Sequence, residues 1–577
     1  MILRYGPLRR LVMHTALAAL LGTGLTALPT VSGTAEAAAV PTHGVWGSYL
    51  AGRHAQRVRD YPAAIEFLGR SLRDDPGNLD VLRQLFLLTV AEGQIDYALT
   101  LAPQVLEAAQ TEPLPAMVLL LDRFHAGAYQ ETLDRLAAEE AYGLNQIVMP
   151  FVQAWAQAAV GRREEALALM AADAAPEGLG SLYAVNRGLL LEYLGDAAAA
   201  EAEYKATLAS AGGSDQQPFA VTDALAALYE RQGRADEARA LYEAYAEATE
   251  SRRMIEAAVA RLDGDGTPTP NRATPDAAIS DLFFSVASSL SQEGNEIFSY
   301  VFSRLAVFLD PGNGLALALL AQNLAAQERE EDAIAVYAQV PLSSPMGFSA
   351  RLSMADAMNG LDQVDEAIAA LEELAATYPD DYVPLASVGD YLRGQERYEE
   401  ALDAYERAFA RVPEIKHEHW SLLYYRGIAL ERTGNWERAE KDFLAALDFE
   451  PNQPFVLNYL GYSWVEQGIH LEEAKQMIET AVEERPRDGF IVDSLGWVLY
   501  KLGDYEGAVP HLERAVELEP GDAVINDHLG DAFWRVGRRT EARYQWNRAM
   551  ELDPDEELAA TLEAKLTDGL PDGPTVD

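Results

Sequence analysis

Small and apolar positions recur along the chain at a fixed spacing, and the pattern is clearest near the C-terminus. The segment Gly489–Gly496 has the same order of apolar, polar and small residues as Ala523–Gly530, and the two starts lie 34 residues apart. Matching residues then follow in both units: Ala508, Ala515 and Pro520 in the first, and Ala542, Ala549 and Pro554 in the second. Such a period indicates a stack of short units, each of which buries its apolar face against its neighbours.

Each position of the pattern has a physical reason in a pair of packed helices. Small residues at offsets 8 and 20 let the first helix (A) approach the second (B), and a bulky residue at offset 24 fills the gap between neighbouring repeats. Proline at offset 32 ends helix B because it lacks an amide donor, and glycine near offset 15 supports the turn. The bulky residues are Tyr337, Tyr405, Phe443, Leu512 and Trp546, and the turn glycines are Gly434, Gly503 and Gly537.

The same period extends over most of the chain and predicts about 14 repeats in two blocks. The starts fall near 45, 79, 113, 147, 181 and 219, and then near 280, 314, 348, 382, 420, 454, 489 and 523. We therefore predict an N-terminal block of six divergent repeats over 40–252 and a C-terminal block of eight over 280–556. Glycine and proline in 253–279 predict a linker, and 557–577 a polar capping helix (Leu558–Leu566) with a flexible tail.

The 34-residue length and the order Leu-Gly, Ala, Pro resemble the tetratricopeptide repeat (TPR). This resemblance implies an all-α fold, a TPR α-solenoid in which helix–turn–helix repeats form a right-handed superhelix. It also implies that the A helices line a concave groove, with offsets 2, 5, 9, 12 and 13 facing a ligand. The asparagine that chaperone adaptors of this kind use at offset 9 to clamp a C-terminal carboxylate is absent here.

Those offsets in the last four repeats give a candidate protein-binding groove. It combines aromatic area with carboxylates and cations, which suits an extended peptide or a protein surface. Trp497 and Trp534 have an alternative interpretation, because aromatic residues at this spacing can simply pack between repeats. The candidate groove residues are Tyr424, Arg432, Asn458, Tyr462, Asp493, Trp497, Tyr500, Lys501, Asp527, Asp531, Trp534 and Arg535.

The composition of the chain excludes several classes of function. The 577 residues include 91 acidic and 45 basic ones, a formal net charge of −46 that argues against binding nucleic acid or anionic membrane surfaces. With no cysteine, the chain has no disulfides, thiolate metal sites or lipidated cysteine. No nucleotide-binding or hydrolase motif occurs, and the close pair His417 and His419 is interpreted as part of a solvated loop rather than a metal site. We expect no enzyme, no metal and no cofactor.

The N-terminus has the three-part order of a secretory signal peptide over residues 1–39. Arg4, Arg9 and Arg10 precede the apolar run Leu11–Leu28, and small residues with an Ala-x-Ala pattern follow. An uncleaved anchor is the alternative, since an 18-residue apolar run is at the lower limit for spanning a bilayer. The sequence thus predicts an exported protein of the periplasm or envelope, in contact with membrane only through this segment or through a partner.

The segment Leu457–Trp464, followed by Asp493–Trp497, resembles exported bacterial TPR proteins. The resemblance is to the envelope group that includes the lipoprotein partner of a periplasmic C-terminal processing protease. It implies a non-enzymatic adaptor whose partners are a periplasmic serine protease and cell-wall hydrolases. The chain departs from that group because it has no cysteine to carry the lipid. The alternative is a structural spacer subunit of an envelope secretion or polysaccharide-export complex.

Overall fold

The computed structural model describes residues 45–109, 112–138, 145–176, 179–210, 219–249, 252–264, 269 and 271–571. Every regular element in these residues is helical, which confirms the all-α fold class. The predicted signal peptide lies outside the described residues, as does the end of the predicted tail, 572–577. Across the described part of the chain, no helix is both long and apolar enough to cross a bilayer.

The chain divides into two compact units, residues 1–81 and 82–577. In the first unit, α1 (Val45–Arg57) packs against α2 (Tyr61–Asp74). Asp60 caps α2 by accepting a hydrogen bond from the backbone N–H of Ala63 at 3.0 Å. A side chain at Gly52 would overlap Leu68, so the small residue in the first helix allows the close approach that the pattern predicts.

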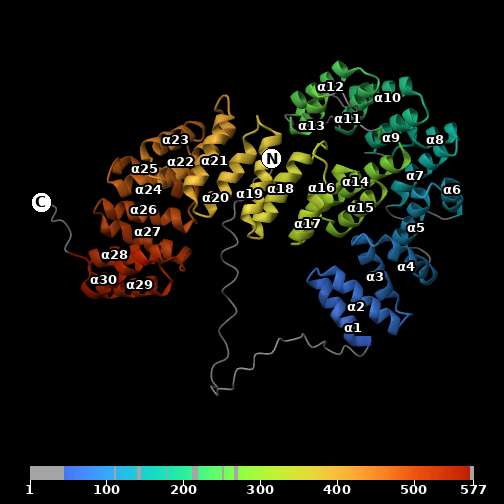
Figure 1. Cartoon of the computed structure of the whole chain (residues 1–577). Helices are drawn as coiled ribbons and strands as arrows, with labels where there is room; N and C mark the ends of the chain where they lie inside the picture. Colours follow the sequence, from blue (N-terminus) through green and yellow to red (C-terminus); the bar gives the residue numbers. More distant parts are fainter. Residues whose placement is uncertain are drawn as a thin grey trace. The chain divides into compact units, whose positions relative to one another are not determined.

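The second unit contains the remaining helix pairs (Figure 1). The pairs of the N-terminal block are α3 (Leu79–Ala91), which begins just before the unit boundary, with α4 (Ile95–Ala108), α5 (Pro113–His125) with α6 (Tyr129–Ala138), α7 (Asn145–Ala159) with α8 (Arg163–Leu169), α9 (Gly180–Tyr193) with α10 (Ala197–Ser210), and α11 (Phe219–Arg231) with α12 (Ala235–Thr249).

The C-terminal pairs are α14 (Pro275–Gln292) with α15 (Glu296–Leu309), α16 (Gly314–Ala326) with α17 (Glu330–Tyr337), α18 (Gly347–Gly360) with α19 (Val364–Thr377), α20 (Val383–Gly394) with α21 (Tyr398–Ala410), α22 (Trp420–Arg432) with α23 (Trp436–Phe449), α24 (Pro454–Gln467) with α25 (Leu471–Glu484), α26 (Gly489–Lys501) with α27 (Tyr505–Leu518), and α28 (Ala523–Arg535) with α29 (Arg539–Glu551). Two single α-helices, α13 (Arg253–Asp263) and α30 (Glu556–Asp568), and two short 3₁₀ helices, Ala172–Ala174 and His417–His419, complete the described elements.

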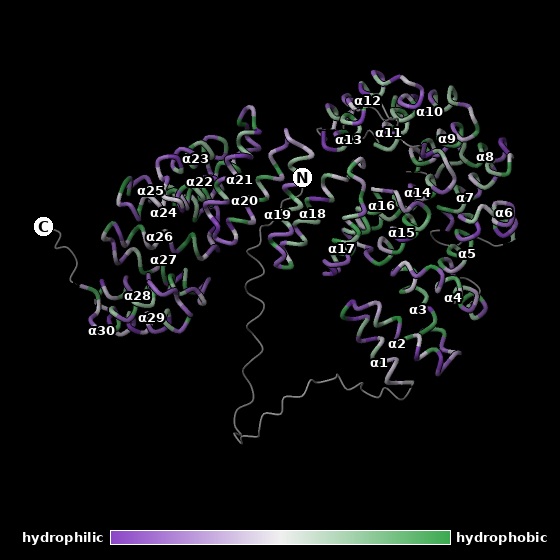
Figure 2. The backbone as a smooth tube through the Cα atoms, in the orientation of Figure 1, coloured by the Kyte–Doolittle hydropathy of each residue, from purple (hydrophilic) through white to green (hydrophobic). Residues whose placement is uncertain are grey.

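The helix pairs agree with the predicted register. Counting both units, the described residues hold 14 pairs, and each A helix begins within five residues of its predicted start. Figure 2 shows hydrophobic and hydrophilic residues alternating along the helices, as paired amphipathic helices require. The chain turns between helices A and B through residues of positive φ, such as Gly434 and Gly503, as predicted. Glu328 and Asp362 take the same conformation without glycine.

The bulky residue of a repeat packs somewhat differently from the prediction. A Cβ added at Gly427 would come within 2.6 Å of the Phe443 ring, and Gly389 stands in the same relation to Tyr405. The bulky side chain at offset 24 therefore lies directly against the small residue at offset 8 of its own repeat. It also joins the core shared with neighbouring repeats, because Phe443 belongs to one cluster with Leu460 and Leu495.

The predicted linker over 253–279 is shorter in the structure than in the prediction. Helix α13 occupies its first part, where Ile255 and Ala258 are buried against the last N-terminal pair. Helix α14 begins at Pro275 and takes up the end of the segment. The glycines and prolines that indicated a linker are confined to 264–275, whereas the flanking residues have an apolar face that packs.

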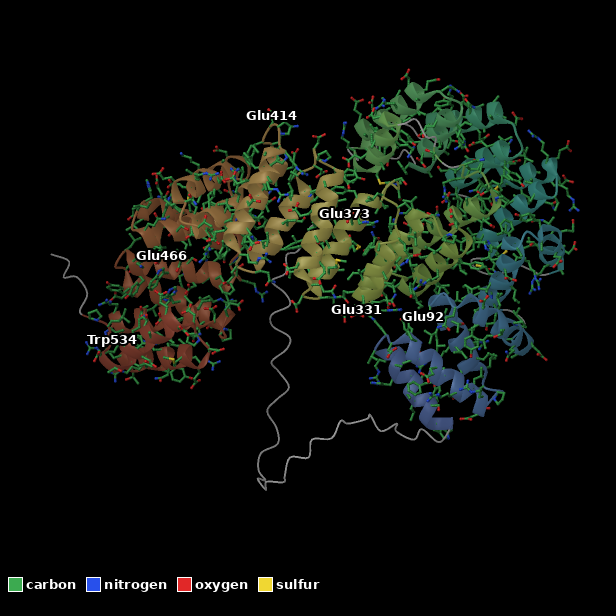
Figure 3. All side chains as sticks on the ribbon, in the orientation of Figure 1. Glu92, Glu331, Glu373, Glu414, Glu466 and Trp534 are labelled. Atoms are coloured by element: carbon green, nitrogen blue, oxygen red, sulfur yellow. The ribbon has the colours of Figure 1, made fainter. Side chains whose placement is uncertain are left out.

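The N-terminal pairs of the second unit contact the first helices of the C-terminal block. Helix α14 packs against the A helices α7 and α9. At the other end of this contact, Arg329 of the α16–α17 turn pairs with Glu92 at 3.0 Å, and both side chains are nearly buried (Glu92 is labelled in Figure 3). The hydroxyl of Tyr300 donates to the same carboxylate at 3.1 Å. The A helices α7 and α9 of the N-terminal block therefore contact a helix of their own chain.

Candidate protein-binding site

The twelve candidate groove residues lie on four successive A helices, α22, α24, α26 and α28. The A helices of neighbouring repeats contact one another directly, for example α24 with α26 and α26 with α28, whereas their B helices are farther apart. This closer spacing makes the row of A helices the inner, concave side of the stack. The structure thus brings the predicted residues onto one row, but it separates them into an accessible group and a buried group.

Trp497 is the centre of the accessible group. Its ring stacks on His528 of the next repeat at 3.8 Å and on Tyr500 at 4.8 Å, with interplanar angles of 13° and 4°. Its indole N–H donates to Glu466 of the preceding repeat at 2.6 Å, and Lys501 pairs with the same carboxylate at 3.4 Å (Glu466 is labelled in Figure 3). The half-buried ring therefore packs between three repeats and keeps an accessible edge.

The repeats before Trp497 continue the row. Tyr462 is half-buried, and burial together with the nearby Glu466 and Asp493 carboxylates raises its pKa. The Arg432 side chain is 54% exposed and lies 3.4 Å from Glu431. The hydroxyl of Tyr459 donates to Glu431 at 3.0 Å. Sequence reasoning missed Tyr459 because it lies at offset 6.

Tyr424 and Asn458 are turned toward the core of the stack more than predicted. The Tyr424 ring packs against Tyr425, Phe443 and Tyr459, and burial raises its pKa. Asn458 is half-buried, and its Oδ1 atom is enclosed within the protein. Both side chains therefore pack beneath the accessible residues of the A helices rather than on the concave surface.

Three predicted groove carboxylates are not on an accessible surface. The exposed fractions of Asp493, Asp527 and Asp531 are 5%, 6% and 5%. Lys565 donates to Asp527 at 2.7 Å and to Asp531 at 2.9 Å, and His528 Nδ1 lies 2.9 Å from Asp493. We call these five residues the acid cluster. The prediction that its carboxylates line an open groove is wrong, because Lys565 of α30 binds Asp527 and Asp531, and His528 of α28 binds Asp493.

The acid cluster changes the titration of its members. Burial, followed by the charge of Asp527, raises the pKa of Asp531 to about 6, although Lys565 opposes this effect. Burial alone would lower the pKa of His528, but Asp493 outweighs it, with Asp527 and Asp531 acting in the same direction, and the pKa is raised. The cluster therefore favours protonated histidine and lysine beside its carboxylates.

Helix α30 takes the place of helix A in a further repeat. Lys565 lies 34 residues after Asp531, which is the repeat period, and Leu562 is completely buried. The predicted capping helix is present, but it is more than a polar cover, because its lysine pairs with two buried carboxylates. The 34-residue spacing of Lys565 from Asp531 could have indicated this pairing from the sequence.

Trp534 and Arg535 lie where the chain's end packs against the last repeat. The guanidinium of Arg535 donates to the hydroxyl of Tyr500 at 3.2 Å and to the carbonyl of Pro571 at 2.8 Å. A side chain at Gly569 would overlap the Trp534 ring. The predicted flexible tail is therefore partly wrong, since the residues up to Pro571 are held against α28.

The His417 and His419 pair is also more ordered than a solvated loop. His419 is buried, its Nδ1 accepts a hydrogen bond from the backbone N–H of Lys416 at 2.9 Å, and its ring packs against Tyr382. His417 Nε2 lies 2.8 Å from Glu450. The two histidines thus anchor the long connection between α21 and α22.

Profiles of the tetratricopeptide repeat match residues 349–381, 389–454 and 494–557. A TPR repeat-containing protein of Pseudomonas aeruginosa is 33% identical over 95 residues, which are 16% of this chain and 16% of that protein. The chain thus spans about a sixth of the length of this curated relative.

Solved helical repeat structures also align with the chain. A chain of the APC/C hetero-tetramer Cut9–Hcn1 aligns over 90% of this chain and 96% of its own length, at 16% identity and a TM-score of 0.37. A tetratricopeptide repeat protein from Parabacteroides merdae aligns over 49% and 96%, at 15% identity and a TM-score of 0.32.

The matched profiles indicate no enzymatic family, and tetratricopeptide repeats are typical of scaffolds for protein–protein interaction. The helix pairs, their period and the profile matches agree along the C-terminal block. Over residues 349–381, 389–454 and 494–557 the chain is similar to tetratricopeptide repeat proteins, and its described residues form an all-α stack of helix pairs.

Proposed function

We propose that the chain is a non-enzymatic scaffold that binds an extended segment of a partner protein along the A helices α22, α24 and α26. The observation that supports this most strongly is a continuous row of half-buried aromatic rings and accessible charges on successive repeats. We call this row the groove stripe: Arg432, Tyr459, Tyr462, Glu466, Trp497, Tyr500 and Lys501. Rings that are already fixed by stacking lose little entropy on binding, and cations supply directional donors.

The N-terminal block is a less suitable surface for the same partner. Its A helices α7 and α9 already contact α14. His125, at the end of α5, lies 3.1 Å from Asp276 of α14, and its ring packs against Phe308. A partner would have to displace these contacts, whereas the groove stripe needs no such rearrangement.

A charge-reversal variant tests the groove stripe without removing a packed ring. Arg432→Glu with Lys501→Glu is compared with Arg514→Glu and Arg548→Glu, which make the same charge change on the outer helices α27 and α29. Tagged full-length chains are used for affinity purification with quantitative mass spectrometry, and thermal unfolding confirms that both variants fold. Proteins retained by the outer variant and lost from the groove variant support the proposal. Equal recovery by both variants would contradict it.

We propose further that the protein is exported to the periplasm or envelope. The three-part pattern of residues 1–39 supports this location. Fractionation of cells that produce the C-terminally tagged chain should place it with periplasmic or envelope markers, and a chain lacking residues 1–39 should stay in the cytoplasmic fraction. Cytoplasmic recovery of both chains would reject export.

The finer proposal is an adaptor that presents cell-wall hydrolases to a periplasmic serine protease. Its support is the resemblance of Leu457–Trp464 to exported TPR proteins, together with the groove stripe on the same helix. Affinity purification from envelope extract should enrich a serine protease or a cell-wall hydrolase. The absence of both classes from proteins that depend on Arg432 and Lys501 would reject this role.

The structural spacer remains the second candidate. The contact of α14 with α7 and α9 favours it, because a block that binds its own chain can serve as a rigid element. A spacer should assemble normally in the Arg432→Glu and Lys501→Glu variant. Loss of assembly in that variant would instead favour the adaptor.

A further inference from the structure

The last helix pair carries a small surface whose charge is opposite to that of the chain as a whole. A hollow of about 410 Å³ is lined by four residues of α28 and α29, which we call the arginine hollow: Trp534, Arg539, Thr540 and Arg543. Arg539 and Arg543 lie one helical turn apart on α29, and both are exposed. Trp534 is labelled in Figure 3. This surface belongs to a chain with a formal net charge of −46.

The two arginines of the hollow have no ion-pair partner among the described residues, whereas other arginines of this region are paired. Arg538 lies 2.9 Å from Glu513 and 2.6 Å from Glu541. The guanidinium groups of Arg539 and Arg543 therefore keep donors that can be offered to a ligand.

A second hollow, of about 360 Å³ between α19, α20 and α21, provides a comparison. Its Arg397 pairs with Glu400 at 2.7 Å, and its Arg407 pairs with Glu372 at 2.6 Å. That hollow is neutralised by its own carboxylates. The arginine hollow has cations of the same type and lacks such neutralisation.

Trp534 provides a fixed apolar surface beside the two cations. The guanidinium carbons of Arg539 and Arg543 lie 4.9 Å and 5.9 Å from the centre of its ring. The ring packs against Trp546 at 5.3 Å, and Gly569 leaves room for it where a side chain would overlap. A ligand would therefore meet a ring that is already positioned.

We propose that the arginine hollow is a docking site for an acidic segment of a partner protein. Two carboxylates of that segment pair with Arg539 and Arg543, and an apolar residue between them contacts Trp534. This proposal goes beyond the groove stripe and does not depend on it, because the two surfaces share no residue.

The charge distribution of the chain favours an acidic peptide over a nucleic acid as the ligand of the hollow. A nucleic acid carries a charge at every nucleotide, so all of it beyond the hollow would meet the acidic surface of the chain. A short acidic segment places only a few charges, and repulsion from distant carboxylates is screened beyond about 8 Å at physiological ionic strength.

The test is fluorescence anisotropy with the full chain and a short labelled peptide in which glutamates flank a leucine. The matched peptide has glutamine at every glutamate. The variant Arg539→Gln with Arg543→Gln is compared with Arg514→Gln and Arg548→Gln, which remove the same charge from exposed positions of α27 and α29. We expect the hollow variant to bind the acidic peptide about tenfold more weakly than the native chain, and the control variant to bind it like the native chain.

Three results would overturn the proposal. The first is equal binding of the glutamate and glutamine peptides. The second is equal binding of the acidic peptide by the hollow variant and the control variant, with both folded by circular dichroism. The third is tighter binding of a single-stranded oligonucleotide than of the acidic peptide, lost in the hollow variant, which would assign the hollow to nucleic acid instead.

Discussion

The repeats of α26 and α28 use the same sequence offsets for opposite purposes. Offset 9 holds Trp497 in α26, where the ring is half-buried and reaches the concave surface. The same offset holds Asp531 in α28, where the carboxylate is buried and bound to Lys565. The difference comes from the following helix, because α28 leaves Trp497 an open edge whereas α30 brings a lysine onto Asp531. Exposure at a groove offset is thus decided by the neighbouring repeat.

The largest expected effect on stability is at the last repeat, which α30 covers. Lys565→Met removes the lysine that pairs with the buried carboxylates of Asp527 and Asp531, which should lower the free energy of unfolding by about 3 kcal/mol. Urea unfolding measures this, with Lys441→Met on the exposed face of α23 as the control, expected within about 0.5 kcal/mol of the native chain. Adding Asp527→Asn and Asp531→Asn should recover part of the loss. A Lys565→Met chain as stable as its control would show that α30 does not close the acid cluster.

The next largest effect on stability is expected at Trp497, in the repeat of α26. Trp497→Ala removes a ring that joins three repeats, and should lower the free energy of unfolding by about 2 kcal/mol. Trp497→Phe keeps the stacking on His528 and loses the hydrogen bond to Glu466, so its cost should be about 1 kcal/mol. Equal stability of the alanine and native chains would mean that Trp497 serves only the surface.

A smaller effect should appear in the pH dependence of stability. The raised pKa of His528 means that the folded state holds more protons than the unfolded state. Its contribution is present below about pH 6.5 and is lost as the pH rises through the folded pKa. The raised pKa of Asp531, about 6, has the same sign at lower pH, since stability from this group falls as the pH rises towards 6.

His511 on α27 gives the opposite control. Burial lowers its pKa, so its contribution is present above about pH 6.5 and is lost as the pH falls through the folded pKa. The difference in free energy of unfolding between the native chain and His528→Gln should therefore shrink from pH 6 to pH 8. The same difference for His511→Gln should grow over this range, in which histidine titrates. The same pH slope for both variants would contradict the assigned environments.

The smallest effect on stability should come from the groove stripe itself. Arg432→Glu with Lys501→Glu changes accessible charges only, and should alter the free energy of unfolding by about 0.5 kcal/mol or less while removing partner binding. A large loss of stability in this variant would contradict the placement of these charges on an accessible surface.

Periodicity predicted the fold well because each repeat depends on local contacts between small and bulky residues. The helix starts and the turn glycines follow from spacing, and the capping helix follows from the need to cover the last apolar face of the stack. Prediction failed where a second part of the chain covers a surface, as α30 covers Asp527 and as α14 lies on α7. An offset identifies the face of a helix, but it does not tell what packs on that face. Lys565 at one full period after Asp531 was the signal in the sequence for the first case.

The most direct test of the account is the comparison of partner recovery by the two charge-reversal variants. Affinity purification is carried out with the native chain, with Arg432→Glu and Lys501→Glu, and with the outer variant Arg514→Glu and Arg548→Glu. We predict that the native chain and the outer variant recover the same partner proteins and that the groove variant loses them, with all three chains equally stable. Recovery of the same partners by all three chains would contradict the claim that the A helices α22, α24 and α26 form the binding surface.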